Sequence, residues 1–570
     1  MEPGSRAGWN SLPQMMLELA VARQGKPMLR HWQAGAWRSV TWGEFAHRVA
    51  AVAAGLRAAG IGPGDRVLLV SENRPEFLIA DTALMAIGAV TVPTYTTNTP
   101  ADHAHILRDS GARVAIVSTA ALAAQVRQAA ALAGGLDLLV TMEPVPADGA
   151  RVIPWTGLEA TPADLGLLRA EAEQIPPGRL ACLIYTSGTG GAPKGVMLPH
   201  RAMLANREGV ATIADKLRLE GETYLSFLPL SHSYEHTVGG FLLPSLGVEV
   251  VYSRGADRIA AEFQEIRPAV VTAVPRLFEV LRARILAGVE KEGGLKETLF
   301  HRALALGLRR MDGPPLGLLE RVQDAVLDRL VRQKVRQRFG GRLQAMVSGG
   351  ARLDPDLSGF FLALGLPVIQ GYGQTEAGPV VSVNMPWNNH RATVGPPLPG
   401  VEIRLAEDGE LCIRGELVMD GYWNQPAATE AAIRDGWLHT GDVAELSEGR
   451  IRITDRKRDF IKTLGGDMVS PAKIESLLMA EPEIHQAVAA GEGQPGIVAL
   501  LVPADGMDNQ VQAAVARVNA KLATIERIRK TALVTPFTVE NGQLTPTMKI
   551  KRRVVLEAHA AEVEALYARG

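Results

Sequence analysis

Short apolar runs that alternate with alanine- and leucine-rich stretches are the feature that most limits the fold of this chain. The runs at 66–70, 113–117 and 180–184 have the length of buried strands, and the stretch at 45–59 has the composition of a helix. Buried strands that alternate with helices form parallel sheets covered by helices. We therefore predict a layered α/β architecture, and a chain of 570 residues requires more than one domain.

The pattern changes between residues 395 and 453, where short β-prone runs are separated by Gly, Asp and Pro and predict a small β-rich subdomain. A charged turn follows at 455–459. Beyond it, Ser470 as N-cap and Pro471 at the first helical position begin a smaller α/β pattern. We expect a large N-terminal domain over 1–455 and a small α/β C-terminal domain over 456–570.

Composition excludes several classes of protein. Hydrophobic residues make up 47% of the chain and charged residues 21%, which is typical of large folded cores, and a net charge of -1 gives no sign of nucleic-acid binding. The first ten residues lack the pattern of a secretory signal, and the longest uncharged run, 82–101, contains prolines and threonines unsuited to a membrane span. Cys182 and Cys412 indicate free thiols in a reducing compartment.

One segment departs from this neutral balance. Residues 276–342 contain 15 Lys and Arg against 8 Asp and Glu, a local net charge of +7. Five of these cations belong to one predicted helix: Arg329, Arg332, Lys334, Arg336 and Arg338. Such a charge would attract anionic lipid or a phosphorylated substrate. A solvated helical face explains it more simply and is the favoured interpretation.

A glycine-rich loop, Tyr185-Thr-Ser-Gly-Thr-Gly-Gly-Ala-Pro-Lys-Gly195, directly follows a predicted strand. Its glycines let backbone N–H groups turn towards phosphate oxygens, the hydroxyls of Thr186, Ser187 and Thr189 can donate to them, and Lys194 adds positive charge. The loop therefore fits a nucleotide polyphosphate. It is not the loop of P-loop kinases or GTPases, because neither Ser nor Thr follows Lys194 directly.

Six further motifs follow in order: Leu228-Pro-Leu-Ser-His232, Ser348-Gly-Gly-Ala351, Gly371-Tyr-Gly-Gln-Thr-Glu376, Gly436-Trp-Leu-His-Thr-Gly-Asp442, the turn at 455–459, and Thr545-Pro-Thr-Met-Lys-Ile550. Together with the loop, they resemble the motifs of the acyl-CoA synthetase, luciferase and peptide-synthetase adenylation superfamily. Gly190 stands where that family usually has a second threonine. The resemblance implies that a carboxylate attacks the α-phosphorus of ATP and expels pyrophosphate.

The resemblance also implies roles for individual residues in binding ATP and Mg²⁺. The phosphates of ATP would be held by Thr186, Ser187, Gly188, Thr189 and Lys194, and the adenine by Gly350, Ala351 and Tyr372. Glu376, with Thr186, would bind Mg²⁺, and Thr375 would contact the α-phosphate. Asp442 would accept hydrogen bonds from both ribose hydroxyls, and Arg456 would contact the nucleotide from the hinge side.

Other matched positions concern catalysis and motion. Lys549 corresponds to the lysine of the mobile C-terminal domain that bridges the carboxylate and the α-phosphate, although Lys551 lies two residues away. Arg458 occupies the hinge position about which this domain is expected to rotate. Two glycines, Gly465 and Gly466, would then enter the site for attack by the coenzyme A thiol. No general base for that thiol is evident in the sequence.

The stretches 228–235, 274–279 and 330–351, and the helical insert between Gly288 and Gly341, resemble the long-chain fatty acyl-CoA synthetases. His232 would line the acyl and adenylate site. A fatty acid, ATP and coenzyme A are therefore the expected partners, and medium-chain or isoprenoid acids stay open. So do two other functions: a fatty acyl-AMP ligase that loads a carrier protein, and a catalytically silent acyl-binding protein.

The stretch His232-Ser-Tyr-Glu-His236 also fits the H-x-x-E-H pattern of one metalloprotease class. That function requires a helix that presents both histidines, but a proline and two glycines lie close by, so we disfavour it. We expect a cytoplasmic protein. Contact with the inner face of a membrane through 276–342, and a homodimer, are left open.

Overall fold

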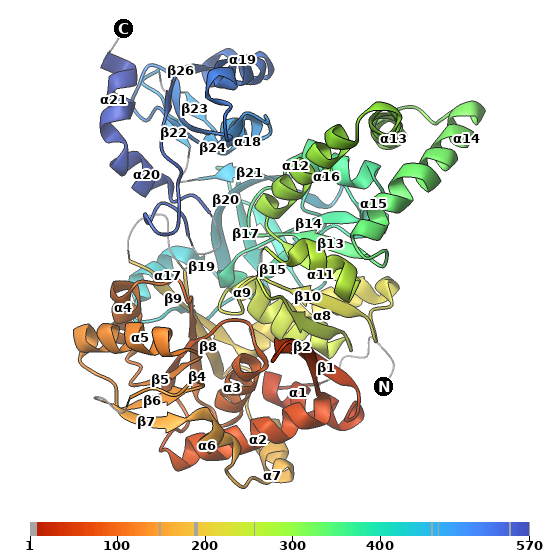
Figure 1. The fold of residues 1–570 in the computed structure, drawn as a ribbon. Coiled ribbons are helices and arrows are strands. Elements are labelled where there is room, and N and C mark those ends of the chain that lie inside the picture. Colours follow the sequence, from red (N-terminus) through yellow and green to blue (C-terminus); the bar gives the residue numbers. More distant parts are fainter. Residues whose placement is uncertain are drawn as a thin grey trace.

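The computed structural model describes residues 8–146, 150–186, 192–255, 257–457, 460–465, 467–545 and 549–568. Within these residues the chain forms five sheets. Two eight-stranded sheets and a five-stranded sheet make up the large N-terminal part, and the small C-terminal part lies against it (Figure 1). This mixed α/β arrangement confirms the predicted fold class.

The first large sheet has a parallel centre and carries helices on both faces. Its strands, in spatial order, are β18 (Gly421–Tyr422), β9 (Lys194–Pro199), β8 (Leu180–Thr186), β4 (Val90–Thr94), β3 (Arg66–Val70), β5 (Val114–Val117), β6 (Leu138–Thr141) and β7 (Arg151–Pro154). Side chains alternate along β3: Leu68 and Val70 face α4 (Pro100–Ser110) and α5 (Ala120–Ala133), whereas Val67 and Leu69 belong to the core that contains α2 (Trp42–Ala58).

The second large sheet is also mostly parallel. Its strands, in spatial order, are β15 (Val380–Val383), β14 (Val368–Gly373), β13 (Ala345–Ser348), β12 (Val270–Ala273), β10 (Thr223–Ser226), β11 (Glu249–Tyr252), β1 (Pro27–Gln33) and β2 (Ala36–Thr41). One face packs against α11 (Ile259–Ile266), α12 (Pro275–Glu292) and α16 (Pro355–Ala363).

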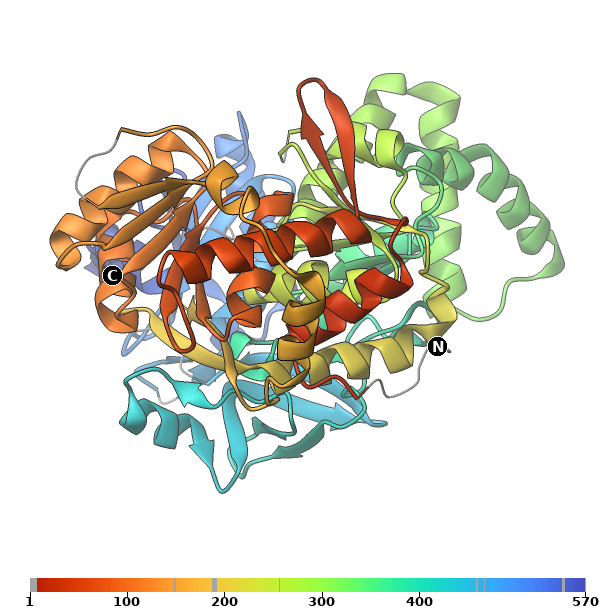
Figure 2. The same ribbon diagram turned by 90° about the horizontal axis from the view of Figure 1, so that it is seen from below.

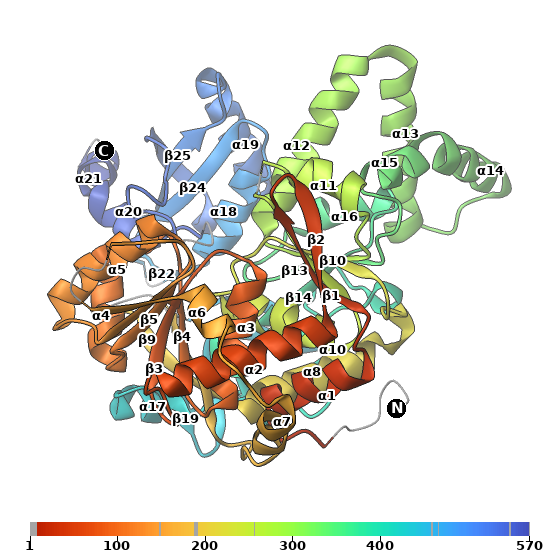
Figure 3. The same cartoon turned by 60° about the horizontal axis from the view of Figure 1, so that its bottom comes forward.

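The core shared by the two large sheets contains α3 (Pro75–Ala86), a helix with apolar residues all round. Figure 3 shows α2 and α3 between the sheets. The other helices of this region are α1 (Leu12–Ala22), α6 (Trp155–Glu159), α7 (Leu165–Glu173), α8 (His200–Ala214), α9 (Ser233–Glu235), the π-helix η2 (His236–Leu242) and α10 (Leu243–Ser245).

The predicted β-rich subdomain is present and contains β16 (Glu402–Leu405), β17 (Glu410–Arg414), β19 (Ile433–Arg434), β20 (Trp437–Ser447) and β21 (Arg450–Arg456), with α17 (Pro426–Ala432) nearby. The C-terminal part contains β22 (Ile461–Lys462), β23 (Met468–Val469), α18 (Pro471–Met479), β24 (Ile484–Ala490), β25 (Ile497–Pro503), α19 (Val511–Lys521), β26 (Ile528–Leu533), α20 (Arg552–Ala558) and α21 (Ala560–Ala568). As predicted, the Ser470 hydroxyl caps α18, which begins at Pro471.

The basic segment 276–342 forms most of a helical arm: α12, α13 (Gly294–Asp312), α14 (Leu318–Leu327), the π-helix η3 (Asp328–Arg332) and α15 (Gln333–Arg338). Figures 1 and 2 show that α13 and α14 project from the body. Many of its cations have partners; Arg332, with a side chain only 1% exposed, pairs with Asp324 at 2.7 Å. At the root of the arm, Arg276 contacts His485 and Arg282 donates to the Ala480 carbonyl, both in the C-terminal part.

Cys182 in β8 and Cys412 in β17 are both buried free thiols, as predicted. Across the described ranges, helices long and apolar enough to cross a membrane are absent.

Candidate active site

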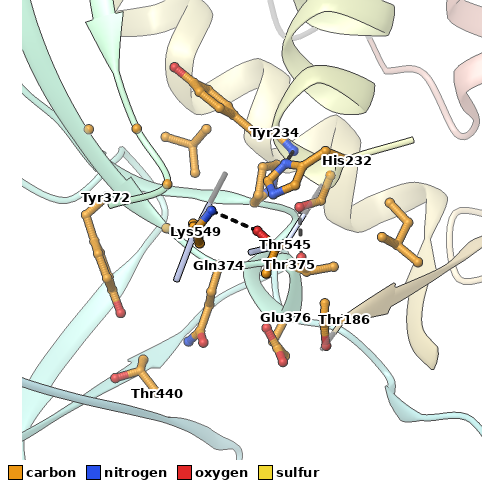
Figure 4. A pocket seen from close by; sticks show the side chains of 18 of the residues that line it. Thr186, His232, Tyr234, Tyr372, Gln374, Thr375, Glu376, Thr440, Thr545 and Lys549 are labelled. Atoms are coloured by element: carbon orange, nitrogen blue, oxygen red, sulfur yellow. Dashed lines mark hydrogen bonds between the residues drawn. The ribbon is translucent and has the colours of Figure 1, made fainter. Parts of the chain in front are cut away.

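One cavity of about 1300 Å³ lies where the two large sheets and the C-terminal part meet. The carboxyl ends of β8 and β14 border it, the position at which open α/β sheets bind ligands. Nine of the predicted site residues line this cavity: Thr186, Lys194, His232, Gly350, Tyr372, Thr375, Glu376, Arg456 and Lys549. Figure 4 shows six of them by name, projecting from several elements, with Thr375 and Glu376 adjacent in one 3₁₀ helix.

The remaining predicted residues fall into two groups. Asp442 is buried directly behind Tyr372, whereas Ala351 and Gly465 are exposed and are not among the residues that line the cavity. Ser187, Gly188, Thr189, Arg458 and Gly466 lie outside the described residues.

Thr186 and Lys194 are held opposite each other because β8 and β9 pair antiparallel on either side of the loop. The ammonium of Lys194 lies 4.9 Å from the centre of the Tyr422 ring, and the hydroxyl of Tyr422 donates to Glu376 Oε1 at 2.9 Å. In Figure 4, Thr186 and Glu376 lie together at one end of the cavity. This end therefore combines a cation, a carboxylate and a hydroxyl, which suits phosphate and a hard metal ion.

Thr375 lies in the first turn of a 3₁₀ helix, η4 (Thr375–Ala377), that follows β14. Its Oγ1 is 2.8 Å from the hydroxyl of Ser233 in α9. This bond ties the two segments together across the cavity and positions Thr375 Oγ1; when Ser233 is the donor, the Thr375 hydroxyl stays free to donate to a ligand.

Asp442 and Arg456 face each other on the paired strands β20 and β21. Asp442 Oδ1 accepts from Arg456 Nε at 3.1 Å, and Oδ2 accepts from the Tyr372 hydroxyl at 2.6 Å. Burial, together with the Asp442 carboxylate, raises the pKa of Tyr372 well above its usual value, so its hydroxyl stays a donor. Gly441 has a φ of +73° and donates its N–H to Glu410 at 2.8 Å, a conformation that favours glycine.

Lys549 reaches the cavity from the C-terminal part, where its backbone N–H donates to the Thr545 hydroxyl at 3.0 Å (Figure 4). Its Cε and Nζ both lie 3.8 Å from the place that a Cβ on Gly350 would occupy. Burial, and then the nearby Arg456, lower the pKa of Lys549 to about 8. The ammonium is thus placed between the strand ends of the large part.

His232 is the N-cap of α9, and its Nδ1 accepts the backbone N–H of Tyr234 at 3.2 Å. Burial, with a smaller effect from Lys549, lowers the pKa of His232 to about 3. The ring is therefore neutral at physiological pH, with its proton on Nε2.

Glu235, next along α9, anchors this segment to the second sheet. Its carboxylate accepts from Tyr224 at 2.6 Å, Ser226 at 2.5 Å and Thr272 at 3.1 Å, and burial raises its pKa to about 7. His236 instead lies 2.9 Å from the buried Asp81. The two histidines of the H-x-x-E-H stretch thus have separate partners, and clusters of metal-ligating side chains are absent from the described ranges.

The other end of the cavity is apolar. Its walls comprise Val210 and Ala214 of α8, Leu217, Val238 and Leu242 of η2, Leu243, Leu246, and the strand residues Val270, Ala345, Val347, Ile369, Val380 and Val383. Val270 is the first residue of β12 and Ala345 the first residue of β13, and both strands run towards the end of the cavity that contains Lys549. β13 ends at Ser348, so from Ala345 to that strand end the cavity extends for roughly 10 Å along the sheet at about 3.3 Å per residue, and Gly349 and Gly350 line it beyond the strand.

Sequence motifs missed two residues that shape the polar end. Ser233 lies within the stretch that begins at His232, so a signal was available there. Tyr422 lies 46 positions from the Glu376 it contacts, and nothing local marks it.

The chain matches the AMP-binding enzyme family over residues 18–423 and the AMP-binding enzyme C-terminal domain over residues 458–570. It is 35% identical to the long-chain-fatty-acid–CoA ligase FadD15 of Mycobacterium tuberculosis over 94% of this chain and 93% of that one. It is 30% identical to the peroxisomal long chain acyl-CoA synthetase 6 of Arabidopsis thaliana, over 94% and 82% of the two chains.

Solved structures share the fold at lower identity. The anthranilate CoA ligase AuaEII in complex with anthranoyl-AMP is 21% identical, with a TM-score of 0.77 over 99% of this chain and all of that one. The o-succinylbenzoate CoA synthetase MenE of Bacillus subtilis, in complex with its acyl-adenylate intermediate, is 20% identical, with a TM-score of 0.69 over 95% and 97% of the two chains.

Proposed function

Because the chain belongs to the AMP-binding enzyme family, we propose that it joins a long-chain fatty acid to coenzyme A at the expense of ATP, releasing AMP and pyrophosphate. The observation that carries this proposal is the cavity itself, in which a long apolar chamber opens onto a cluster of phosphate-binding side chains. An acyl chain fits the first and a nucleotide the second, so the carboxylate of the acid meets the α-phosphate where they join.

In the first step, a carboxylate oxygen attacks the α-phosphorus and pyrophosphate leaves, giving the acyl-adenylate. Lys549 brings its ammonium between the two anions and lowers their repulsion, while Thr375 donates to the α-phosphate. Lys194 and Thr186 hold the outer phosphates, together with Ser187, Gly188 and Thr189 of the same loop. Neutral His232 lines the place where the apolar chamber meets the phosphate-binding end of the cavity, and its Nε2–H is available there as a hydrogen-bond donor.

The adenosine occupies the side of the cavity bordered by β14 and β20. Tyr372 provides the stacking face for adenine beside Gly350 and Ala351. Asp442 accepts the ribose hydroxyls, and Arg456 contacts the nucleotide from the hinge side.

Mg²⁺ fits the residues present at the phosphate end. Protein sites for Mg²⁺ with nucleotides use one or two oxygen donors, and substrate phosphates complete the coordination. Glu376 and Thr186 supply such oxygens side by side. When bound, Mg²⁺ would neutralise the charge that develops on the leaving pyrophosphate.

In the second step the coenzyme A thiolate attacks the acyl carbon and AMP leaves. Rotation of the C-terminal part about Arg458 would withdraw Lys549 and bring Gly465 and Gly466 to the site. We place the boundary between the moving parts at 455/456. Gly465 is exposed outside the cavity and Lys549 lines it, an arrangement that fits a chain poised for the first step.

Chain length is the property that the apolar chamber selects, since each buried methylene contributes about 0.8 kcal/mol. Ala214, from α8, lies in the same apolar cluster as Ala345 and Ile369, towards the end far from Lys549. We expect Ala214→Phe to shift the preferred acid to a shorter chain without weakening ATP binding. Loss of activity with acids of every length would indicate that Ala214 does not set the chain length that the chamber accepts.

The proposal is tested by pyrophosphate release with ATP and Mg²⁺ across straight-chain acids, with and without coenzyme A. Sustained release that requires coenzyme A and is greatest with long chains is the expected result. A single stoichiometric burst that coenzyme A does not extend would indicate a fatty acyl-AMP ligase that loads a carrier protein. No release with any acid would indicate a silent acyl-binding protein.

Location and assembly belong to the same proposal. The two free thiols support a cytoplasmic location. We place the protein at the inner face of a membrane, which it contacts through residues 276–342. A homodimer is the assembly to test by light scattering.

A further inference from the structure

The arm formed by α13 and α14 has one covered face and one bare face. Ala303 and Leu306 of α13 pack against Leu316 and Leu327, which fixes α14 to its neighbour. In Figure 1, α14 rises from α15 to the far end of the arm, away from the body. Its other face meets no element among the described residues.

That bare face is apolar. The exposed side chains on it are Leu318, Leu319, Val322, Val326 and Leu330, the first two 82% and 88% exposed. Four of them follow one another at intervals of four residues, so they form a single stripe along the helix. A contiguous apolar stripe on a projecting arm marks an interaction surface rather than scattered surface residues.

The charges around the stripe have one sign. The three acids of α14 and η3 are drawn away into ion pairs: Glu320 with Arg309, Asp324 with Arg310 and Arg332, and Asp328 with Arg336. Arg321, Arg329 and Lys334 are exposed. Within the part of the chain that the structure describes, they make no ion pair.

We propose that the apolar stripe of α14 and η3 inserts into the surface of an anionic lipid membrane, with Arg321, Arg329 and Lys334 bound to lipid phosphates. An apolar helix face bordered by cations is the pattern of helices that lie in the plane of a membrane surface. A second copy of the chain fits less well, because a twofold contact would set the same cations against each other.

The proposed docking depends on the apolar stripe and not only on the charge of the basic segment. Eight of the 15 cations of the basic segment are held in ion pairs. We therefore attribute the affinity mainly to the apolar side chains, and the choice of lipid to the three cations beside the stripe. It also rests on the proposed function, since a long-chain fatty acid is held in membranes and docking would place the enzyme beside its substrate.

The test compares the full-length protein with Leu318→Gln/Val322→Gln/Val326→Gln on vesicles of phosphatidylcholine with phosphatidylglycerol. The matched control is Leu132→Gln/Leu167→Gln/Val21→Gln, three apolar residues that are more than half exposed elsewhere. We expect the stripe variant to lose at least about tenfold in partitioning, because three fewer apolar groups are buried, and the control variant to match the wild type.

A second variant, Arg321→Gln/Arg329→Gln/Lys334→Gln, separates charge from apolar contact. It should weaken binding to phosphatidylglycerol vesicles and make the remainder insensitive to salt, with no change on pure phosphatidylcholine. Equal partitioning of wild type and stripe variant would overturn the proposal, as would a wild type that binds neither vesicle. A dimer that the stripe variant dissociates would assign the surface to a second copy instead.

Acyl-CoA formation from dissolved acid, measured without vesicles, keeps this proposal separate from the function. All variants should retain it, because none of the substituted residues lines the cavity. Vesicle binding without any acyl-CoA formation would refute the proposed function and leave the docking surface standing.

Discussion

Asp442 allows the proposed nucleotide site to be tested atom by atom. Its carboxylate already accepts one bond on each oxygen, from Tyr372 at 2.6 Å and from Arg456 at 3.1 Å. An ionised carboxylate has about four acceptor positions, so each oxygen retains one for a ribose hydroxyl. The side chain is only 5% exposed, so its contacts are already largely shielded from water, and a bound ribose would cover the part that remains.

Asp442→Asn preserves the size of the side chain and removes its charge. A hydrogen bond to a charged group contributes about 1.5–3 kcal/mol, against about 0.5–1.5 kcal/mol for a neutral one. In the wild type, removal of one ribose hydroxyl should therefore weaken nucleotide binding by about 10- to 150-fold. In the Asn variant, the same removal should cost only about 2- to 12-fold.

The assay is equilibrium binding of ATP, 2′-deoxy-ATP and 3′-deoxy-ATP to wild type and variant, arranged as a double-mutant cycle. Asp408→Asn is the matched control, an exposed acid on the neighbouring turn that pairs with Lys457. The reasoning is refuted if deletion of each hydroxyl costs the variant as much as it costs the wild type, because Asp442 then does not contact the ribose.

Four further predictions concern three other residues. Lys549→Ala should abolish acyl-adenylate formation and spare thioester formation from supplied acyl-adenylate, and equal loss of both partial reactions would contradict its role. Because burial lowers the pKa of Lys549 to about 8, the needed ammonium is lost as pH rises, so wild-type kcat/KM for pyrophosphate release should fall about tenfold per pH unit above that value; a flat profile would count against it. Glu376→Gln should raise the Mg²⁺ concentration for half-maximal rate at least about tenfold, and an unchanged Mg²⁺ titration would remove Glu376 from the metal site. Arg332→Ala removes one of the two cations that pair with the buried Asp324 and should lower the local stability of the arm by about 1.5–3 kcal/mol, against less than about 0.5 kcal/mol for the exposed Arg329→Ala, as read from hydrogen exchange over α13–α16; similar exchange in the two variants would refute the estimate.

The layered α/β fold followed from the sequence because its signals are local. A short apolar run between helical stretches specifies a buried strand whatever lies elsewhere, and β3, β5 and β8 formed where such runs were predicted. Ser470 and Pro471 likewise determine the start of α18 through bonds within one turn.

The site was less accessible to such reasoning, because its geometry depends on contacts across the fold. Through resemblance the motifs named nine residues that line the cavity, yet the Tyr422 hydroxyl that holds Glu376 comes from a two-residue strand paired with β9. No local pattern predicts that pairing. Ala351 is exposed outside the cavity although its neighbour Gly350 lines it, since the chain turns at Gly350, which lies two residues beyond the end of β13 and has a φ of +77°.

The basic segment shows why a count of charges does not define a surface. Its net charge of +7 is correct, but an ion pair such as Arg310 with Asp324 joins residues 14 positions apart and neutralises the two charges locally. Arg332 contributes no charge to the outer face, because its side chain is buried and bonds Asp324 and the carbonyl of Ala363. What remains outward is decided by which side chains the fold leaves exposed and unpaired, and on α14 these are the apolar stripe and Arg321. A membrane that bound this arm through charge alone would release it in high salt, whereas one that takes up the Leu318 stripe would retain part of it, so residual binding at high salt measures the apolar contribution directly.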